Sequence, residues 1–117
     1  MFFKKKKSIL NIVLDAYNSL FEMWKKESFN DGSIDEIAYV KDNIKIIFQE
    51  DLREHITNLF VIDSKKQIGK VYYREIILNK EMVGIDKIKN SLASLKNNSE
   101  KQEVEIYIEF LKLNKIL

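Results

Sequence analysis

The side chains of this chain that could do chemistry are mainly carboxylates, because the sequence has no cysteine and a single histidine. One group, at a predicted turn, consists of Glu50, Asp51 and Glu54. The other group, on one face of a predicted strand, consists of Glu103, Glu105 and Glu109. General acid–base catalysis would need one carboxyl group with a raised pKa in an enclosed site. The sequence pattern indicates no enclosure for either group, and we interpret the strand face with Glu103, Glu105 and Glu109 as a solvated face.

The single histidine, His55, has no partners in the sequence that would make it catalytic. Catalysis would need an orienting acid and a nucleophile or substrate pocket. Glu54 is adjacent, but neighbours on a strand point to opposite faces of the sheet. We therefore expect a structural or surface histidine. The absence of cysteine excludes disulfides, thiolate metal sites and a cysteine nucleophile, and with one histidine we expect no zinc site.

The stretch ESFNDGSIDE at residues 27–36 partly resembles an EF-hand calcium loop centred on Gly32. Phe29, however, occupies a ligand position, and Ala38 stands where the bidentate glutamate belongs. We therefore expect no calcium binding. The sequence also has no phosphate-binding glycine loop and no serine in a nucleophile-elbow motif. We expect no cofactor, and we expect a chain that is not an enzyme.

Four consecutive lysines carry all the excess positive charge of the chain: Lys4, Lys5, Lys6 and Lys7. The net charge is +2, and without these four it would be 2 − 4 = −2. We expect residues 1–7 to form a disordered basic arm, and residues 8–117 to form one domain. Four lysines at about 1 kcal/mol each could give weak contact with an anionic membrane surface. A nucleic-acid binder usually spreads basic residues over a face of the fold, so we do not expect nucleic-acid binding.

The hydrophobic pattern predicts a two-layer α+β domain with the N-terminal helix packed on a mainly antiparallel sheet. An amphipathic helix is expected from Ser8 to about residue 27, with Asn11, Asp15 and Asn18 on its polar stripe. Those polar residues argue against a signal peptide, and no segment is long and apolar enough to span a bilayer. The absence of cysteine fits a cytoplasmic location.

Four strands and a second helix are expected next. The first strands lie near residues 36–40 and 44–49, with a tight turn at Asp42-Asn43. The other two lie at residues 55–63 and 68–78, and a helix follows from Asp86 with Ile88, Leu92 and Leu95 on one face.

The last segment, residues 103–113, fits either a strand or a helix. Val104, Ile106, Ile108 and Phe110 alternate with polar residues, as in a strand. Val104, Tyr107, Ile108 and Leu111 also recur at helical spacing. We predict a strand, which gives the order α-β-β-β-β-α-β.

The two central strands carry apolar residues on both faces, although a sheet covered by helices on one side should alternate more cleanly. Something should therefore cover part of the second face: a helix, a small-ligand cavity or another protein chain. We predict a partner-binding surface composed of Leu59, Val61, Tyr72, Arg74 and Ile76.

Three function classes remain open on the sequence. We favour a non-enzymatic protein-binding module, such as an adaptor, inhibitor or immunity-type protein, whose partner is another chain or a second copy of itself. The first alternative is a ligand-binding or enzymatic domain with a pocket between helix and sheet. The second is a nucleic-acid accessory protein that uses the lysine arm.

Overall fold

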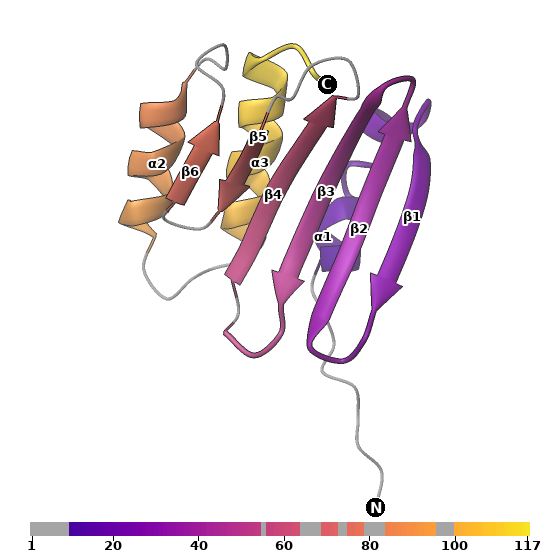
Figure 1. The fold of residues 1–117 in the computed structure, drawn as a ribbon, viewed down its shortest axis with the longest axis horizontal. Helices are drawn as coiled ribbons and strands as arrows, with labels where there is room; N and C mark the ends of the chain where they lie inside the picture. The colour runs from indigo at the N-terminus through magenta and orange to yellow at the C-terminus, as the bar shows by residue number, and fades with distance from the viewer. Residues whose placement is uncertain (1–9, 55, 64–68, 73–74, 79–83, 96–99) are drawn as a thin grey trace, which may run out of the picture.

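Six strands follow one another in chain order and form a single antiparallel sheet in the computed structural model of the chain (Figure 1). The structure describes residues 10–54, 56–63, 69–72, 75–78, 84–95 and 100–117. The strands are β1 (Lys25–Asn30), β2 (Ile34–Lys41), β3 (Ile44–Asp51), β4 (Ile56–Asp63), β5 (Gly69–Tyr72) and β6 (Glu75–Leu78). The helices are α1 (Leu10–Asp15), α2 (Ile85–Ser94) and α3 (Glu100–Leu113), with a short 3₁₀ helix, η1 (Asn18–Phe21).

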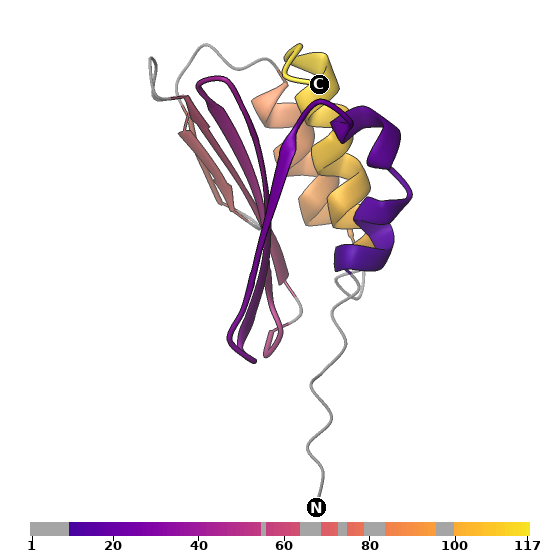
Figure 2. The same ribbon diagram turned by 90° about the vertical axis from the view of Figure 1, so that its right-hand side faces the viewer.

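The helices form one layer, and the sheet forms the other (Figure 2). The two-layer α+β class predicted from the sequence is confirmed, with the N-terminal helix packed on the sheet side that α2 and α3 also cover. None of the described helices combines the length and apolarity needed to cross a membrane.

Hairpin register explains which side chains enter the core. The predicted Asp42-Asn43 turn is confirmed, since Lys41 pairs directly with Ile44. From there the register places Ile46 and Phe48 on the same face as Val61 and Leu59. All four are completely buried under the helices.

The expected long N-terminal helix is wrong in its second half. Helix α1 ends at Asp15, the 3₁₀ helix follows, and the chain is already a strand from Lys25. The aromatic ring of Phe21 stacks on Tyr39 at 3.8 Å between centroids and meets Trp24 and Phe48 edge-on. These contacts favour a turn of the chain onto the sheet over a continuous helix.

The segment predicted as a final strand is instead helix α3, so the predicted order is corrected at its end. Its core residues Val104, Tyr107, Ile108 and Leu111 are fully buried. They follow the helical spacing, whereas Ile106, which strand alternation would bury, is only half-buried. The single strand expected over residues 68–78 is likewise two short strands, β5 and β6, which pair with each other.

Gly84 precedes helix α2 in a left-handed conformation with φ +84°, which side chains other than that of glycine rarely adopt. A Cβ at this position would lie 2.6 Å from Cδ2 of the exposed Leu113, so the Leu113 side chain would have to move as well. The core side chains Ile88 and Leu92 of α2 match the face predicted for this helix.

Candidate functional site: the open face of the sheet

The side of the sheet opposite the helices is not covered by any described element (Figure 2). We call this side the open face. The register of β1–β4 assigns its side chains to four rows across the strands: Lys25, Val40, Lys45 and Ile62; Glu27, Ala38, Ile47 and Phe60; Phe29, Glu36, Gln49 and Asn58; and Ile34, Asp51 and Ile56. The first two rows bring four large or branched apolar residues into one area.

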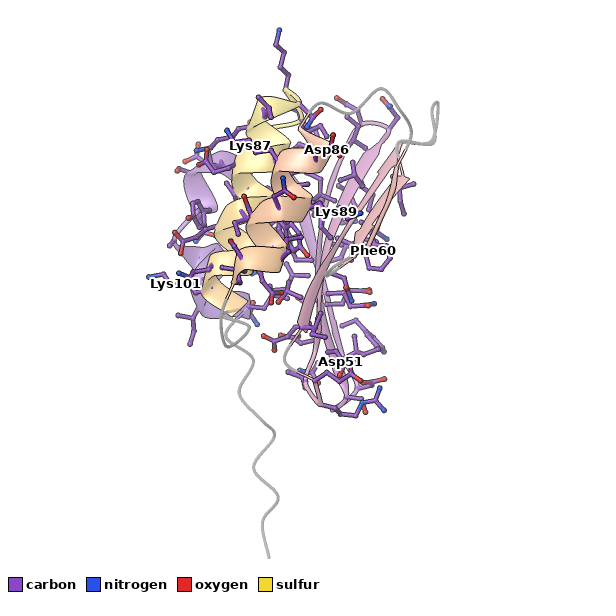
Figure 3. All side chains as sticks on the ribbon, turned by 90° about the vertical axis from the view of Figure 1, so that its left-hand side faces the viewer. Asp51, Phe60, Asp86, Lys87, Lys89 and Lys101 are labelled. Carbon is purple, nitrogen blue, oxygen red and sulfur yellow. The ribbon has the colours of Figure 1, made fainter. Side chains whose placement is uncertain are left out.

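The apolar part of the open face is accessible to solvent. Phe29 and Ile62 are 55% and 42% exposed, whereas Val40, Ile47 and Phe60 are partly buried by their neighbours. Figure 3 shows the ring of Phe60 directed away from the helices. Large apolar side chains grouped on an exposed surface are typical of interaction sites.

Charge is distributed unequally along the open face. Lys25 and Lys45 lie in the row nearest the β2–β3 turn, which we call the lysine end. Glu36 and Asp51 lie toward the β3–β4 turn, which we call the acidic end. The Gln49 amide donates a 2.9 Å hydrogen bond to Glu36 Oε1, which holds that carboxylate on the face.

The turn after β3 fixes Asp51 at the acidic end. Burial opposes ionisation of this carboxyl group, but the backbone N–H groups of Arg53 and Glu54 donate to its Oδ1, and the Arg53 guanidinium lies 3.6 Å away. These interactions outweigh burial and lower the pKa of Asp51, so its charge is retained into the acidic range.

The predicted partner-binding residues do not share one surface. Leu59 and Val61 are fully buried beneath the helices, so their assignment to an open face is wrong. Their outward neighbours on β4, Phe60 and Ile62, take that place. The backbone of Tyr72 pairs with that of Glu75, and Ile76 pairs with Val71.

Several predicted residues lie outside the part of the chain that the structure describes. These are Arg74, His55 and the four lysines from Lys4 to Lys7. The side chains of Tyr72 and Ile76 also lie outside the described set, although their strands are placed.

A second cluster of polar groups lies on the helix-covered face. The register aligns Asp35, Glu50 and Thr57 in one row across β2, β3 and β4, and all three are at most 3% exposed. Glu103 of α3 is fully buried above this row and accepts a 2.7 Å hydrogen bond from the backbone N–H of Thr57. The expectation that Glu103 lies on a solvated face is therefore wrong, and Glu50, for which the sequence indicated no enclosure, is buried as well.

This buried row joins two layers of the fold. The described β4–β5 pairing runs from Leu59 to Val61 and does not reach Thr57. Glu103 accepts from the N–H of Thr57, and the Tyr107 hydroxyl donates to its carbonyl oxygen at 2.7 Å. Side chains of α3 thus take the place of a neighbouring strand. Among the described residues, no group of acidic or histidine side chains has the arrangement of a metal site.

A groove of about 420 Å³ lies in the helix layer, between α2 and α3. Ile88, Ile106, Phe110 and Leu113 supply its apolar lining, and the rest is Gly84, Lys87, Ser91, Glu105 and Glu109. None of these residues belongs to the sheet, so this groove is not the predicted pocket between helix and sheet.

The loop that resembles a calcium site is a tight β-hairpin turn. Asp31 Oδ1 accepts hydrogen bonds from the backbone N–H groups of Ser33 and Ile34, and Gly32 has φ +90°. These bonds lower the pKa of Asp31. Strand β2 follows directly, so the helix that an EF-hand requires after the loop does not form.

Comparison of the chain with protein-family models, with curated proteins and with solved structures finds no match. The geometry of the open face therefore has to carry any functional conclusion.

Proposed function

We propose that this chain is a non-enzymatic protein-binding module, of the adaptor, inhibitor or immunity class, that binds its partner through the open face. One observation carries the proposal: all the described helices cover the same side of the sheet, and the opposite side exposes apolar residues (Figure 2). Their centre is Ile47 and Phe60, with Val40 and Ile62 beside them.

The composition of the open face supports a protein partner over a small ligand. Protein interfaces combine an aromatic and aliphatic centre with a charged rim. Here Phe60 and Ile47 form the centre, while Lys45 and Glu36 stand toward opposite rims. A face of a sheet is broad and shallow, whereas small ligands need a cavity that encloses most of their surface.

The test is recovery of partners by affinity-tagged protein in the host, with an untagged copy of the chain co-expressed. We expect Phe60→Glu and Ile62→Glu to lose a partner that the wild-type chain recovers, because each places a charge in the apolar centre. Lys87→Glu is the matched control, since Lys87 is an exposed residue of α2 in the helix layer (Figure 3).

The result is read from which variants lose a protein. A protein, or the untagged copy, that is recovered by wild type and Lys87→Glu but lost by both face variants supports the proposal. If every recovered protein is retained equally by all four chains, the open face is not a binding surface and the proposal is wrong.

A further inference from the structure

We propose that the partner seated on the open face is a second copy of this chain, so that two sheets pack face to face in a symmetric dimer. This inference rests on the proposed function and specifies its partner. It follows from the way charge and apolar residues are placed relative to a possible two-fold axis.

The first argument is charge complementarity of the face with itself. The two-fold axis of such a dimer lies between the two sheets and parallel to them. If it runs perpendicular to the strands, the strands of the second copy point in the opposite direction to those of the first. The lysine end of one copy, with Lys25 and Lys45, then lies over the acidic end of the other, with Glu36 and Asp51. An axis along the strands would instead bring the two lysine ends together and the two acidic ends together, which costs energy. The first arrangement is therefore the more favourable one at both ends of the face, although Glu27, in the second row on β1, then lies opposite its own copy.

The same axis brings apolar residues together. Ile47 and Phe60 lie in the second of the four rows, near the middle of the face. They therefore lie close to the axis in both copies. Side chains from two facing sheets interdigitate about 10 Å apart in aligned packing, which is the geometry of a β-sandwich. The dimer would thus convert an open two-layer fold into one with a second, intermolecular core.

The size of the open face is adequate for such a dimer. Strands β2, β3 and β4 have eight residues each, and β1 has six. At about 4.8 Å between strands and about 3.3 Å per residue, these four strands cover roughly 19 by 26 Å, or about 500 Å². The shorter β5 and β6 add about 130 Å² by the same spacing. Specific interfaces need about 600–1,000 Å² per partner, so the face reaches this range.

The test is sedimentation equilibrium of the purified full-length chain from low to high micromolar concentration. We expect a reversible dimer, and we expect Phe60→Glu to weaken dimerisation by about tenfold or more, as for a central apolar anchor. Lys87→Glu should dimerise like wild type. Circular dichroism melting of each variant verifies that the monomer is folded.

A charge-reversal cycle tests the orientation of the two copies. Lys45→Glu and Glu36→Lys should each weaken the dimer several-fold, because each places like charges at one end of the interface. Combining both changes restores opposite charges across the axis, so the double variant should dimerise more strongly than either single one. Glu36 is chosen over Asp51 because a change of Asp51 would also break the hydrogen bonds of the β3–β4 turn and the ion pair with Arg53, whereas Glu36 accepts a hydrogen bond from the Gln49 side chain on the same face.

Three outcomes separate this inference from the proposed function. A dimer that Phe60→Glu disrupts and the double charge variant restores supports both. A dimer that persists in Phe60→Glu pairs through another surface, such as the β1 edge, and overturns the inference. A monomer at all concentrations also overturns the inference. In that case, a different partner that is recovered by wild type but not by Phe60→Glu would still support the proposed function.

Discussion

Two buried hydrogen bonds at Thr57 should hold α3 onto the sheet, and their removal can be measured directly. The Thr57 N–H donates to Glu103 Oε2, and the Tyr107 hydroxyl donates to the Thr57 carbonyl oxygen, each at 2.7 Å. All three residues have no exposed surface. Water cannot replace a lost partner there unless the structure opens.

Tyr107→Phe removes the hydroxyl group and keeps the ring in the core. The buried Thr57 carbonyl then loses a donor, and we expect the free energy of unfolding to fall by about 1–2 kcal/mol. Glu103→Ala leaves the buried Thr57 N–H without its acceptor and also removes most of a buried side chain, so we expect a loss of roughly 2–3 kcal/mol. Glu103→Gln keeps an acceptor oxygen and should cost less than Glu103→Ala.

Equilibrium urea unfolding measures these changes as a shift in the midpoint at constant slope. Tyr39→Phe is the matched control, because the buried Tyr39 hydroxyl has no hydrogen-bond partner among the residues that the structure describes. That change should not reduce stability. If Tyr107→Phe is as stable as wild type, then Tyr107 is solvated, as it would be on a strand face shared with glutamates, and the docking of α3 described above is wrong.

Two further predictions concern single positions. Asp42 has φ +53° in the turn between β2 and β3, so Asp42→Gly should relieve a strained conformation and raise the melting temperature by a few degrees, whereas Asp42→Val should lower it. Burial, and secondarily the charge of Asp15, raises the pKa of Tyr39 to about 12. The folded state therefore retains this proton above the ordinary tyrosine pKa, so stability should fall as pH rises from about 10 to about 12. Alkaline unfolding of Tyr39→Phe should show a smaller fall, and an identical fall would contradict this assignment.

The parts of the fold that could be predicted are those where local signals agree with the final packing. The β2–β3 hairpin follows from two apolar runs around Asp42-Asn43, and α2 follows from Ile88 and Leu92 at helical spacing. Strand β1 could not be found in this way, because all six of its residues are exposed and show no alternation. Its pairing with β2 makes it a strand. The Asn30-Asp31-Gly32 turn before Ile34 was the available signal.

The terminal segment shows why two periodicities in one stretch cannot be separated locally. Val104 and Ile108 fit both a strand face and a helix face. Tertiary contacts decide between them: Tyr107 and Glu103, which would be polar positions on a strand, have buried hydrogen-bond partners at Thr57.

The prediction of the binding residues is wrong for a related reason. The sequence shows two apolar faces on β4, but only the register with β3 and the position of the helices place Leu59 and Val61 inside.

One row of the sheet buries polar residues while apolar residues lie on the open face, and this combination is the strongest reason to regard the open face as functional. On β3, Glu50 is buried while Ile47 faces outward, and on β4, Thr57 is buried while Phe60 and Ile62 face outward. Folding alone would favour the opposite arrangement, because burying a polar group costs energy and an exposed apolar group contributes little to the monomer. Departures from the local rules of folding concentrate at functional sites. In the buried row, the backbone of Thr57 forms hydrogen bonds with side chains of α3, so this row has a role within the monomer. The outward residues keep part of their apolar surface accessible to solvent, and association through the open face would bury it.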